Sequence, residues 1–368
     1  MTIVGLYSDS RILGGAERSL LNLAAAYRGD FDIVVCSPHP ELVEAAESIE
    51  GVRTHRLRTR TAPVAGTWDH RREFRRLGIQ LLQVTLANPF ASRPAILGGV
   101  LARIPTIGVE QLVLPSRRRR GSFVKRCTAA LQAGVVAVGE RSAEDLGEYF
   151  AIRPHRITVV HNGVPARAYD RPTPGSTPLV GCAARLEDQK GVDLLLQAMT
   201  QVPEARREIL GDGGRRRSLE QLRDELGLAD RVTFRGWIDD APAVMAGWDI
   251  FALASRDEAF PLTIVEAMLA GTPVIATDVG SVAEAVRHDD TGLLVESGDI
   301  DAMAAAIRRL IDDVELRARF TERGREHAST NFTDTAMADG YERLWRAVLD
   351  GADGRSSGRP ARGSGRSG

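Results

Sequence analysis

The sequence is poor in cysteine. Its three cysteines, Cys36, Cys127 and Cys182, are odd in number and widely spaced. This spacing fits neither a disulfide framework nor a set of metal ligands, and it indicates a reducing compartment. The chain also lacks an apolar run of the ~18 residues that a membrane-spanning helix needs. Its first residues carry no basic segment of a signal peptide, so we expect a cytoplasmic protein.

Lysine is scarce as well, since only Lys125 and Lys190 occur among the 48 lysine and arginine residues. Where arginine serves nearly every other basic position, a retained lysine indicates a site that needs a compact ammonium group. We therefore interpret Lys190 as a functional residue. The alternative is that two lysines survive by chance.

The formal charge of the chain is −1, yet its arginines gather in two clusters. One cluster spans 117–120 and is followed by Lys125 and Arg126, and the other lies within 71–76. Such clusters are either solvated surface or binding sites for phosphates on a membrane surface or an acceptor. The balanced total charge and the lack of basic motifs with interleaved aromatic residues argue against nucleic acid.

The 368 residues fit two domains of roughly 150–200 residues each. In both halves short apolar runs alternate with helical patterns, which predicts parallel βαβ units and an α/β fold. The strands predicted in the first half are 2–7, 31–36, 81–85, 106–109 and 134–138, and its helices are 16–27, 41–49, 91–102, 122–131 and 142–149. The strands predicted in the second half are 179–183, 208–210, 232–234, 249–254, 273–277 and 292–295, before helices 299–331, broken near Asp313, and 334–349.

These patterns divide the chain into a first domain over 1–168, a linker over 169–178 and a second domain over 179–333. A last helix over 334–350 is expected to cross back to the first domain. The segment 351–368 has no large apolar residue, so we predict a disordered tail. Two doubly wound domains that face each other place a ligand in the cleft at the carboxyl ends of both sheets.

The segment 256–271 is the most informative motif. It places Glu258 ahead of a helix, Pro261 in the first turn and Glu266 inside the helix, directly after a predicted strand. A helix N-terminus with two carboxylates can hold an anionic ligand that is rich in hydroxyl groups. The alternative is a helix that buries an apolar face and carries these two charges incidentally.

Three further loops follow predicted strands. Gly14-Gly15 precedes the first helix and allows backbone N–H groups to approach a phosphate or sugar, although an ordinary flexible loop has the same pattern. Arg185 and Lys190 lie five residues apart and suit a diphosphate, unless they only pair with neighbouring carboxylates. The glycines that begin at Gly211, and Trp237 one strand later, suit a planar base or a tight turn.

Together these motifs resemble the retaining GT-B glycosyltransferases of family 4. The matching elements, in family order, are Asn162-Gly163-Val164, Arg185-Leu186 with Lys190-Gly191, Gly211-Asp212-Gly213, Phe234-x-Gly236 and Glu258-x7-Glu266. The pattern continues through Gly271-Thr272-Pro273, Gly280-Ser281, Glu284 and Thr291-Gly292. The resemblance covers nearly all of residues 1–350 and implies two Rossmann-like domains, of which the first binds the acceptor and the second binds a nucleotide sugar.

The resemblance also implies roles for single residues. Arg185 and Lys190 would bind the donor diphosphate and, with Glu258 on the transferred sugar, form the catalytic set. Glu266 would bind the ribose. The other donor-binding residues would be Gly15, Gly211, Trp237, Phe260, Pro261, Leu262 and Thr263. Such enzymes need neither a metal ion nor a protein nucleophile, so we expect no cofactor besides a UDP- or GDP-sugar donor.

One position departs from the family pattern. Similar enzymes often carry a histidine after the strand predicted at 106–109, where this chain has Glu110 and Gln111. We expect both residues on the acceptor side, together with Arg117 and Arg118. If this basic cluster is functional, the acceptor is lipid-linked and the enzyme sits peripherally on the inner face of a membrane; otherwise a natural product fits equally. The alternatives are a non-catalytic sugar-nucleotide-binding partner, or an epimerase or phosphorylase of the same architecture.

Overall fold

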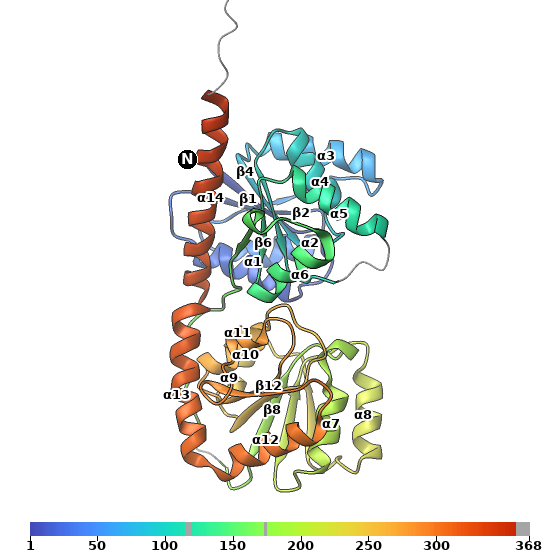
Figure 1. The fold of residues 1–368 in the computed structure, drawn as a ribbon, viewed down its shortest axis with the longest axis vertical. Coiled ribbons are helices and arrows are strands. Elements are labelled where there is room, and N and C mark those ends of the chain that lie inside the picture. Colours follow the sequence, from blue (N-terminus) through green and yellow to red (C-terminus); the bar gives the residue numbers. More distant parts are fainter. Residues whose placement is uncertain (115–118, 173–174, 358–368) are drawn as a thin grey trace, which may run out of the picture.

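The computed structural model describes residues 1–114, 119–172 and 175–357. Two domains are stacked along the long axis, and two successive helices, α13 (Val314–Asn331) and α14 (Asp334–Ser357), run beside the second and the first domain respectively (Figure 1). Each domain is a parallel sheet covered by helices. Within the described ranges, no helix is both long enough and apolar enough to cross a bilayer.

The first domain contains a seven-stranded parallel sheet in the order β3-β2-β1-β4-β5-β6-β7. Its strands are β1 (Ile3–Tyr7), β2 (Asp32–Ser37), β3 (Arg53–Arg56), β4 (Leu81–Leu86), β5 (Thr106–Glu110), β6 (Gly134–Ala137) and β7 (Ile157–Val159). Its helices are α1 (Gly15–Ala26), α2 (Pro40–Glu47), α3 (Pro63–Arg76), α4 (Arg93–Leu101), α5 (Arg119–Leu131), α6 (Glu140–Phe150) and the 3₁₀ turn η1 (Pro154–Arg156).

The second domain contains a six-stranded parallel sheet in the order β10-β9-β8-β11-β12-β13. Its strands are β8 (Leu179–Ala183), β9 (Arg206–Leu210), β10 (Val232–Gly236), β11 (Ile250–Leu253), β12 (Val274–Thr277) and β13 (Gly292–Val295). Its helical elements are η2 (Asp188–Lys190), α7 (Val192–Thr200), α8 (Arg216–Glu225), α9 (Ala241–Met245), α10 (Leu262–Leu269), α11 (Val282–Ala285), α12 (Ile300–Asp312) and α13 (Val314–Asn331), and α14 (Asp334–Ser357) follows them.

The predicted α/β class and the parallel sheets are confirmed. The prediction missed β3 and β7, which are the two edge strands of the first sheet, and it missed α3. Edge strands bury little side-chain area, so their residues need no apolar run. Helix α3 was missed because its exposed side is rich in arginine and its buried side includes polar residues.

The predicted end of the last helix, at 349, is wrong, because α14 continues to Ser357. Adding turns to an existing helix costs little compared with starting one, so a helix already held by packing extends beyond its apolar segment. The prediction of a disordered tail therefore fails for 351–357. The rest of that segment, 358–368, lies outside the described residues.

Helix α14 packs on the first domain next to α1 (Figure 1). Trp345 is fully buried there, and its Nε1 donates a hydrogen bond to Oε1 of Gln83 on β4 at 2.9 Å. Its ring contacts the rings of Tyr27 and Phe31. The chain thus crosses between the domains twice, once after β7 and once at α14.

A carboxylate of the second domain also binds the first. Glu284 on α11 accepts hydrogen bonds from the N–H groups of Glu140 and Arg141, in the first turn of α6, at 2.9 and 3.2 Å. It also pairs with His161 Nε2 at 2.7 Å. Burial opposes the ionisation of Glu284, but these hydrogen bonds outweigh it and lower its pKa to about 2. Glu284 is therefore a charged clamp between the domains.

We predict that Glu284→Gln lowers the free energy of unfolding at pH 7 by about 1–2 kcal/mol, because an ionised acceptor at a helix N-terminus is lost. The pKa of Glu284 is depressed in the folded protein, so its contribution is complete above the unfolded value near 4.5 and falls as the pH drops towards 2. Urea unfolding between pH 7 and pH 3 measures this. The difference from wild type should shrink with falling pH, whereas the exposed control Glu204→Gln should show no difference. A constant difference would contradict the clamp.

Candidate functional site

A cavity of about 380 Å³ lies between the two domains. The segments after β1, β4, β5 and β7 form its wall on the first domain, and the segments after β8, β9, β10 and β11 form its wall on the second. Parallel strands end with their carboxyl ends at one edge of a sheet, which is where open α/β sheets bind ligands. The cavity therefore lies where the fold predicts a site.

The cavity wall includes twelve of the fifteen residues that the sequence indicated: Gly15, Gln111, Arg185, Lys190, Gly211, Trp237, Glu258, Phe260, Pro261, Leu262, Thr263 and Glu266. Arg117 and Arg118 lie outside the described residues. The remaining residue, Glu110, does not line the cavity.

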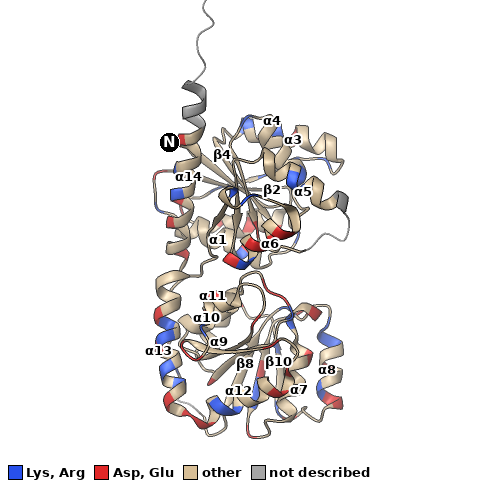
Figure 2. Ribbon diagram, in the orientation of Figure 1, with Lys and Arg blue, Asp and Glu red and all other residues tan. Residues whose placement is uncertain are grey.

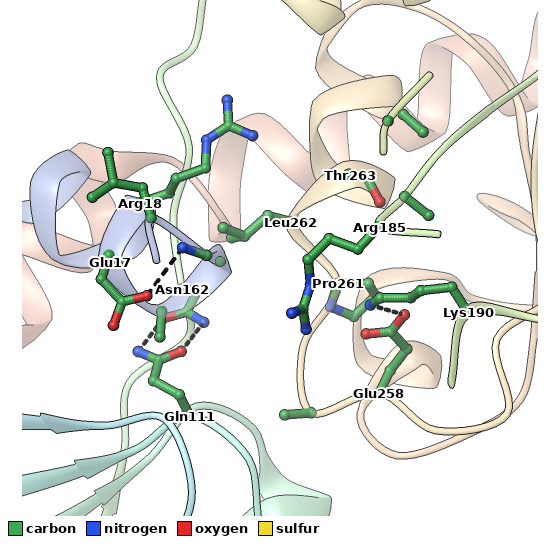
Figure 3. A pocket seen from close by; sticks show the side chains of 18 of the residues that line it. Glu17, Arg18, Gln111, Asn162, Arg185, Lys190, Glu258, Pro261, Leu262 and Thr263 are labelled. Atoms are coloured by element: carbon green, nitrogen blue, oxygen red, sulfur yellow. Dashed lines mark hydrogen bonds and ion pairs between the residues drawn. The ribbon is translucent and has the colours of Figure 1, made fainter. Parts of the chain in front are cut away.

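Lys190 and Glu258 form an ion pair on the wall of the second domain. Lys190 follows β8, Glu258 follows β11, and these two strands are neighbours in the sheet. The Lys190 Nζ atom lies 2.6 Å from Oε1 of Glu258 (Figure 3), and Oγ of Ser255 donates to the same oxygen at 2.7 Å. Only 5% of the Glu258 side chain and 18% of the Lys190 side chain are exposed. The pair is thus fixed in position, with the ammonium at the cavity surface.

Gly280 packs directly against the backbone of Glu258. Its φ angle is +54°, and a Cβ atom at this position would lie 1.5 Å from the carbonyl oxygen of Glu258. Any other residue would displace the loop that carries the carboxylate. This close approach gives a physical reason for the Gly280-Ser281 element of the motif.

Arg185 is the second cation of this wall. Its side chain is exposed and points into the cavity towards the Lys190–Glu258 pair in Figure 3. The neighbouring carboxylates have other partners, because Glu187 accepts from the N–H of Gly214 and Asp188 pairs with Arg215. Among the residues that the structure describes, none pairs with Arg185. The guanidinium is therefore available to an anion.

The N-terminus of α10 supplies further positive potential. Pro261 caps the helix in an extended conformation, so the N–H groups of Leu262 and Thr263 have no acceptor within the helix. One turn later, Glu266 is 8% exposed, and its Oε2 atom has no hydrogen-bond partner in the described structure. Burial raises the pKa of Glu266, with Arg18 opposing this effect. A buried carboxylate with an unpaired oxygen suits hydroxyl donors of a ligand.

Two amide side chains pair with each other on the wall of the first domain. Asn162 Nδ2 donates to Oε1 of Gln111 at 2.9 Å, and Gln111 Nε2 donates back to Oδ1 of Asn162 at 3.3 Å. Ser19 also donates to this oxygen at 2.6 Å. An imidazole ring has no carbonyl oxygen and cannot complete this reciprocal pair, so Gln111 suits its neighbour. The sequence identifies Asn162 only as the first residue of the Asn162-Gly163-Val164 element, without a role in the cavity.

Glu17 and Arg18 are further cavity residues that the sequence-based prediction missed. Glu17 is buried, accepts from Ser8 Oγ at 2.9 Å, and accepts from the N–H of Gly14 at 3.1 Å. It therefore fixes the Gly14-Gly15 turn. Its position three residues after Gly14 is the spacing of a capping box and could have identified it. The Arg18 guanidinium lies 5.8 Å from the ring of Trp237, on the opposite domain.

The prediction that Glu110 faces the acceptor is wrong. Glu110 is fully buried and forms an ion pair with Lys125, which is 1% exposed. Side chains alternate between the two faces of a strand, so Glu110 points into the domain while the next residue, Gln111, reaches the cavity. Burial raises the pKa of Glu110, and Lys125 opposes this effect. Lys125, the other lysine of the chain, thus belongs to a buried ion pair and not to an acceptor-binding surface.

Comparison with known proteins places the chain in a family. The model "Glycosyltransferase Family 4" matches residues 13–167, and the model "Glycosyl transferases group 1" matches residues 170–327. A lipopolysaccharide core biosynthesis mannosyltransferase of Rhizobium leguminosarum bv. viciae is 30% identical over 272 residues, 70% of this chain and 76% of the relative. The chain therefore belongs to the family 4 glycosyltransferases.

Another relative, a lipopolysaccharide core biosynthesis glycosyltransferase of Rhizobium meliloti (strain 1021), is 35% identical over 172 residues, which are 47% of this chain. The matched segment spans about half, 51%, of that relative's length. The crystal structure of Anabaena HepE in complex with UDP has a TM-score of 0.81 at 24% identity, covering 94% of this chain and 100% of the other. This likeness shows that the fold is GT-B.

The unpaired oxygen of Glu266 leads to a prediction that separates function from stability. A raised pKa means that the ionised carboxylate opposes folding, and this cost grows as the pH rises above the unfolded value near 4.5. We predict that Glu266→Gln raises the free energy of unfolding at pH 8 by about 1 kcal/mol while it weakens nucleotide-sugar binding. Thermal unfolding between pH 5 and pH 8 and ligand titration measure the two effects. A less stable variant with unchanged binding would contradict this role.

Proposed function

We propose that the protein is a retaining glycosyltransferase that moves a hexose from a UDP- or GDP-sugar to an acceptor hydroxyl without a metal ion. One observation carries this proposal. A single cavity is lined by the cations Arg185 and Lys190, which follow β8, and by the N-terminus of α10 and the unpaired oxygen of Glu266, which follow the neighbouring strand β11. An anionic group flanked by hydroxyl-bearing sugars is the ligand that these groups complement.

The donor would lie along the wall of the second domain. Its diphosphate would bind between Arg185 and Lys190, near the N–H groups of Leu262 and Thr263, with Gly15 approaching from the opposite domain. Its ribose hydroxyls would donate to Glu266. Its base would occupy the part of the cavity lined by Gly211 and Trp237. The Anabaena structures similar in fold contain UDP and UDP-glucose, which supports a UDP donor.

Glu258 would accept hydrogen bonds from hydroxyls of the transferred sugar. Lys190 and Ser255 share its Oε1 atom and hold the carboxylate in place. In the reaction, the bond between the anomeric carbon and the phosphate oxygen breaks, and the acceptor oxygen forms a bond to the same face of that carbon. The acceptor proton passes to the departing phosphate. Arg185 and Lys190 stabilise the charge that develops there, which is the role that a metal ion has in other transferases.

The acceptor would bind towards the first domain. That side of the cavity includes Ile12, Leu13, Ala87 and Leu112, and Ile12 is 68% exposed. An apolar wall suits an acceptor with an apolar part. A lipid-linked glycan of the cell envelope has this chemistry, and two relatives are named for lipopolysaccharide core biosynthesis. A natural product with an apolar ring system fits the same wall.

We predict that the protein releases nucleotide from a UDP- or GDP-sugar when an acceptor is present, at the same rate with or without EDTA. Turnover excludes the alternative of a non-catalytic sugar-nucleotide-binding protein, and formation of a glycoside excludes an epimerase. Loss of activity in EDTA that Mg²⁺ restores would contradict the metal-independent mechanism.

Removal of either cation tests the phosphate site. Lys190→Ala and Arg185→Ala are each predicted to lower kcat by about 10²- to 10³-fold, because a preorganised charge that stabilises the leaving group is lost. Arg217→Ala is the matched control, since Arg217 is exposed on α8 of the same domain and does not line the cavity. Equal activity of Lys190→Ala and Arg217→Ala would remove the proposed role of Lys190.

A further inference from the structure

The segment from β3 to the end of α3 is the most basic part of the described first domain. Residues 53–76 contain eight arginines and two carboxylates, although the whole chain has a formal charge of −1. Neither the cavity nor the proposed transfer reaction uses these arginines. Helix α3 lies with α4 and α5 at the same end of the first domain (Figures 1 and 2).

Both carboxylates of this segment are already paired. Asp69 accepts two hydrogen bonds from the Arg60 guanidinium at 2.8 and 2.9 Å, and these lower the pKa of Asp69 to about 2. Glu73 is buried and lies 3.2 Å from His55 Nε2. Glu73 is therefore buried in the domain, and the charge of Asp69 is neutralised at the surface by Arg60. The charge that α3 presents to solvent is positive.

The same outer face exposes apolar side chains. Val64 is 75% exposed and Trp68, one turn later, is 53% exposed. The Arg71 guanidinium lies 5.3 Å from the Trp68 ring. Arg72 and Arg75 continue the stripe at helical spacing, and one nitrogen of Arg75 also donates to the carbonyl of Ala102 at 3.4 Å. The opposite face of α3 is closed by α4, where a Cβ atom on Gly98 would lie 2.7 Å from His70 Cβ. An aromatic and a branched aliphatic side chain therefore stand among arginines on an uncovered helix face.

This face begins near the acceptor side of the cavity. Helices α3 and α4 run in the same direction, because Gly66 faces Pro94 and Arg71 Nε donates to the carbonyl of Leu101. Both helices start at the carboxyl edge of the first sheet. There Ser92, at the start of α4, is bonded to Asp9 in the loop after β1. The same loop supplies Ser10, Ile12 and Leu13 to the cavity wall.

We propose that this α3 face, formed by Val64, Trp68, Arg71, Arg72, Arg75 and Arg76, docks on an anionic lipid surface. Arginines would bind lipid phosphates while Val64 and Trp68 enter the boundary between headgroups and acyl chains. Exposed Val64 favours a lipid surface over nucleic acid, which offers no apolar layer to an aliphatic side chain. Docking would bring the acceptor side of the cavity to the membrane. This consequence rests on the proposed transfer to a lipid-linked acceptor.

Vesicle binding by the full chain tests the proposal. Wild-type protein should float with vesicles of phosphatidylcholine containing 30% phosphatidylglycerol, and should remain unbound with phosphatidylcholine alone or in 0.5 M NaCl. Arg72→Glu with Arg76→Glu should lower the partition coefficient at least tenfold, and Val64→Ser with Trp68→Ser should lower it severalfold. Arg72 and Arg76 are exposed and have no partner among the described residues, so this pair leaves the fold intact.

The matched control is Arg217→Glu with Arg325→Glu, which changes the net charge equally on the second domain and should bind vesicles as wild type does. The proposal would be overturned if both charge-reversal double variants lost vesicle binding equally, or if the wild-type protein did not bind anionic vesicles. Preferential binding to an anionic RNA over the vesicles would overturn it as well. Nucleotide-sugar binding is measured on the same variants without vesicles. Failure to dock with intact nucleotide binding contradicts only the lipid surface, whereas absent nucleotide binding contradicts the proposed function.

Discussion

The ion pair between Lys190 and Glu258 is the interaction on which the rest of the site depends. It joins the loops after β8 and β11, the neighbouring strands at which the strand order of the second sheet reverses direction. An open α/β sheet has its crevice at this point. Pairing places an ammonium at the cavity surface without leaving a buried carboxylate uncompensated. The N-terminus of α10 and the loop with Arg185 are then arranged around a cation that is already in position.

The two walls of the cavity differ in chemistry. The second domain contributes cations, a helix N-terminus and the unpaired oxygen of Glu266, which suit a charged donor. The first domain contributes the neutral pair of Gln111 and Asn162, apolar side chains, and the charged residues Glu17 and Arg18. Glu284 and helix α14 connect the two domains. A glycosyltransferase binds two different substrates side by side, so two walls of different chemistry suit its reaction.

The sequence was sufficient to predict the fold and a set of site residues of which most line the cavity, for a physical reason. Strands that are buried on both faces appear in the sequence as continuous apolar runs. Ligands of a parallel sheet bind at the carboxyl ends of its strands, so glycines and charged residues directly after these runs indicate the binding site. The arrangement of contacts was not predictable, because Lys190 and Glu258 meet across 68 intervening positions. The prediction for Glu110 failed because side chains alternate between the two faces of a strand. The position at which β5 ends decides whether Glu110 or Gln111 faces the cavity, and the sequence did not show that position. The edge strands β3 and β7 carried no apolar signal.

The proposed donor site requires that Arg185 and Lys190 bind the phosphates of a nucleotide, and not its base or ribose. Calorimetric titration of wild type and of Arg185→Ala with Lys190→Ala, using UDP, UMP and uridine or the guanosine series, measures this directly. We predict that the double variant loses at least tenfold in affinity for the diphosphate and keeps the affinity for the nucleoside. An equal loss for all three ligands, or unchanged affinity for the diphosphate, would contradict it.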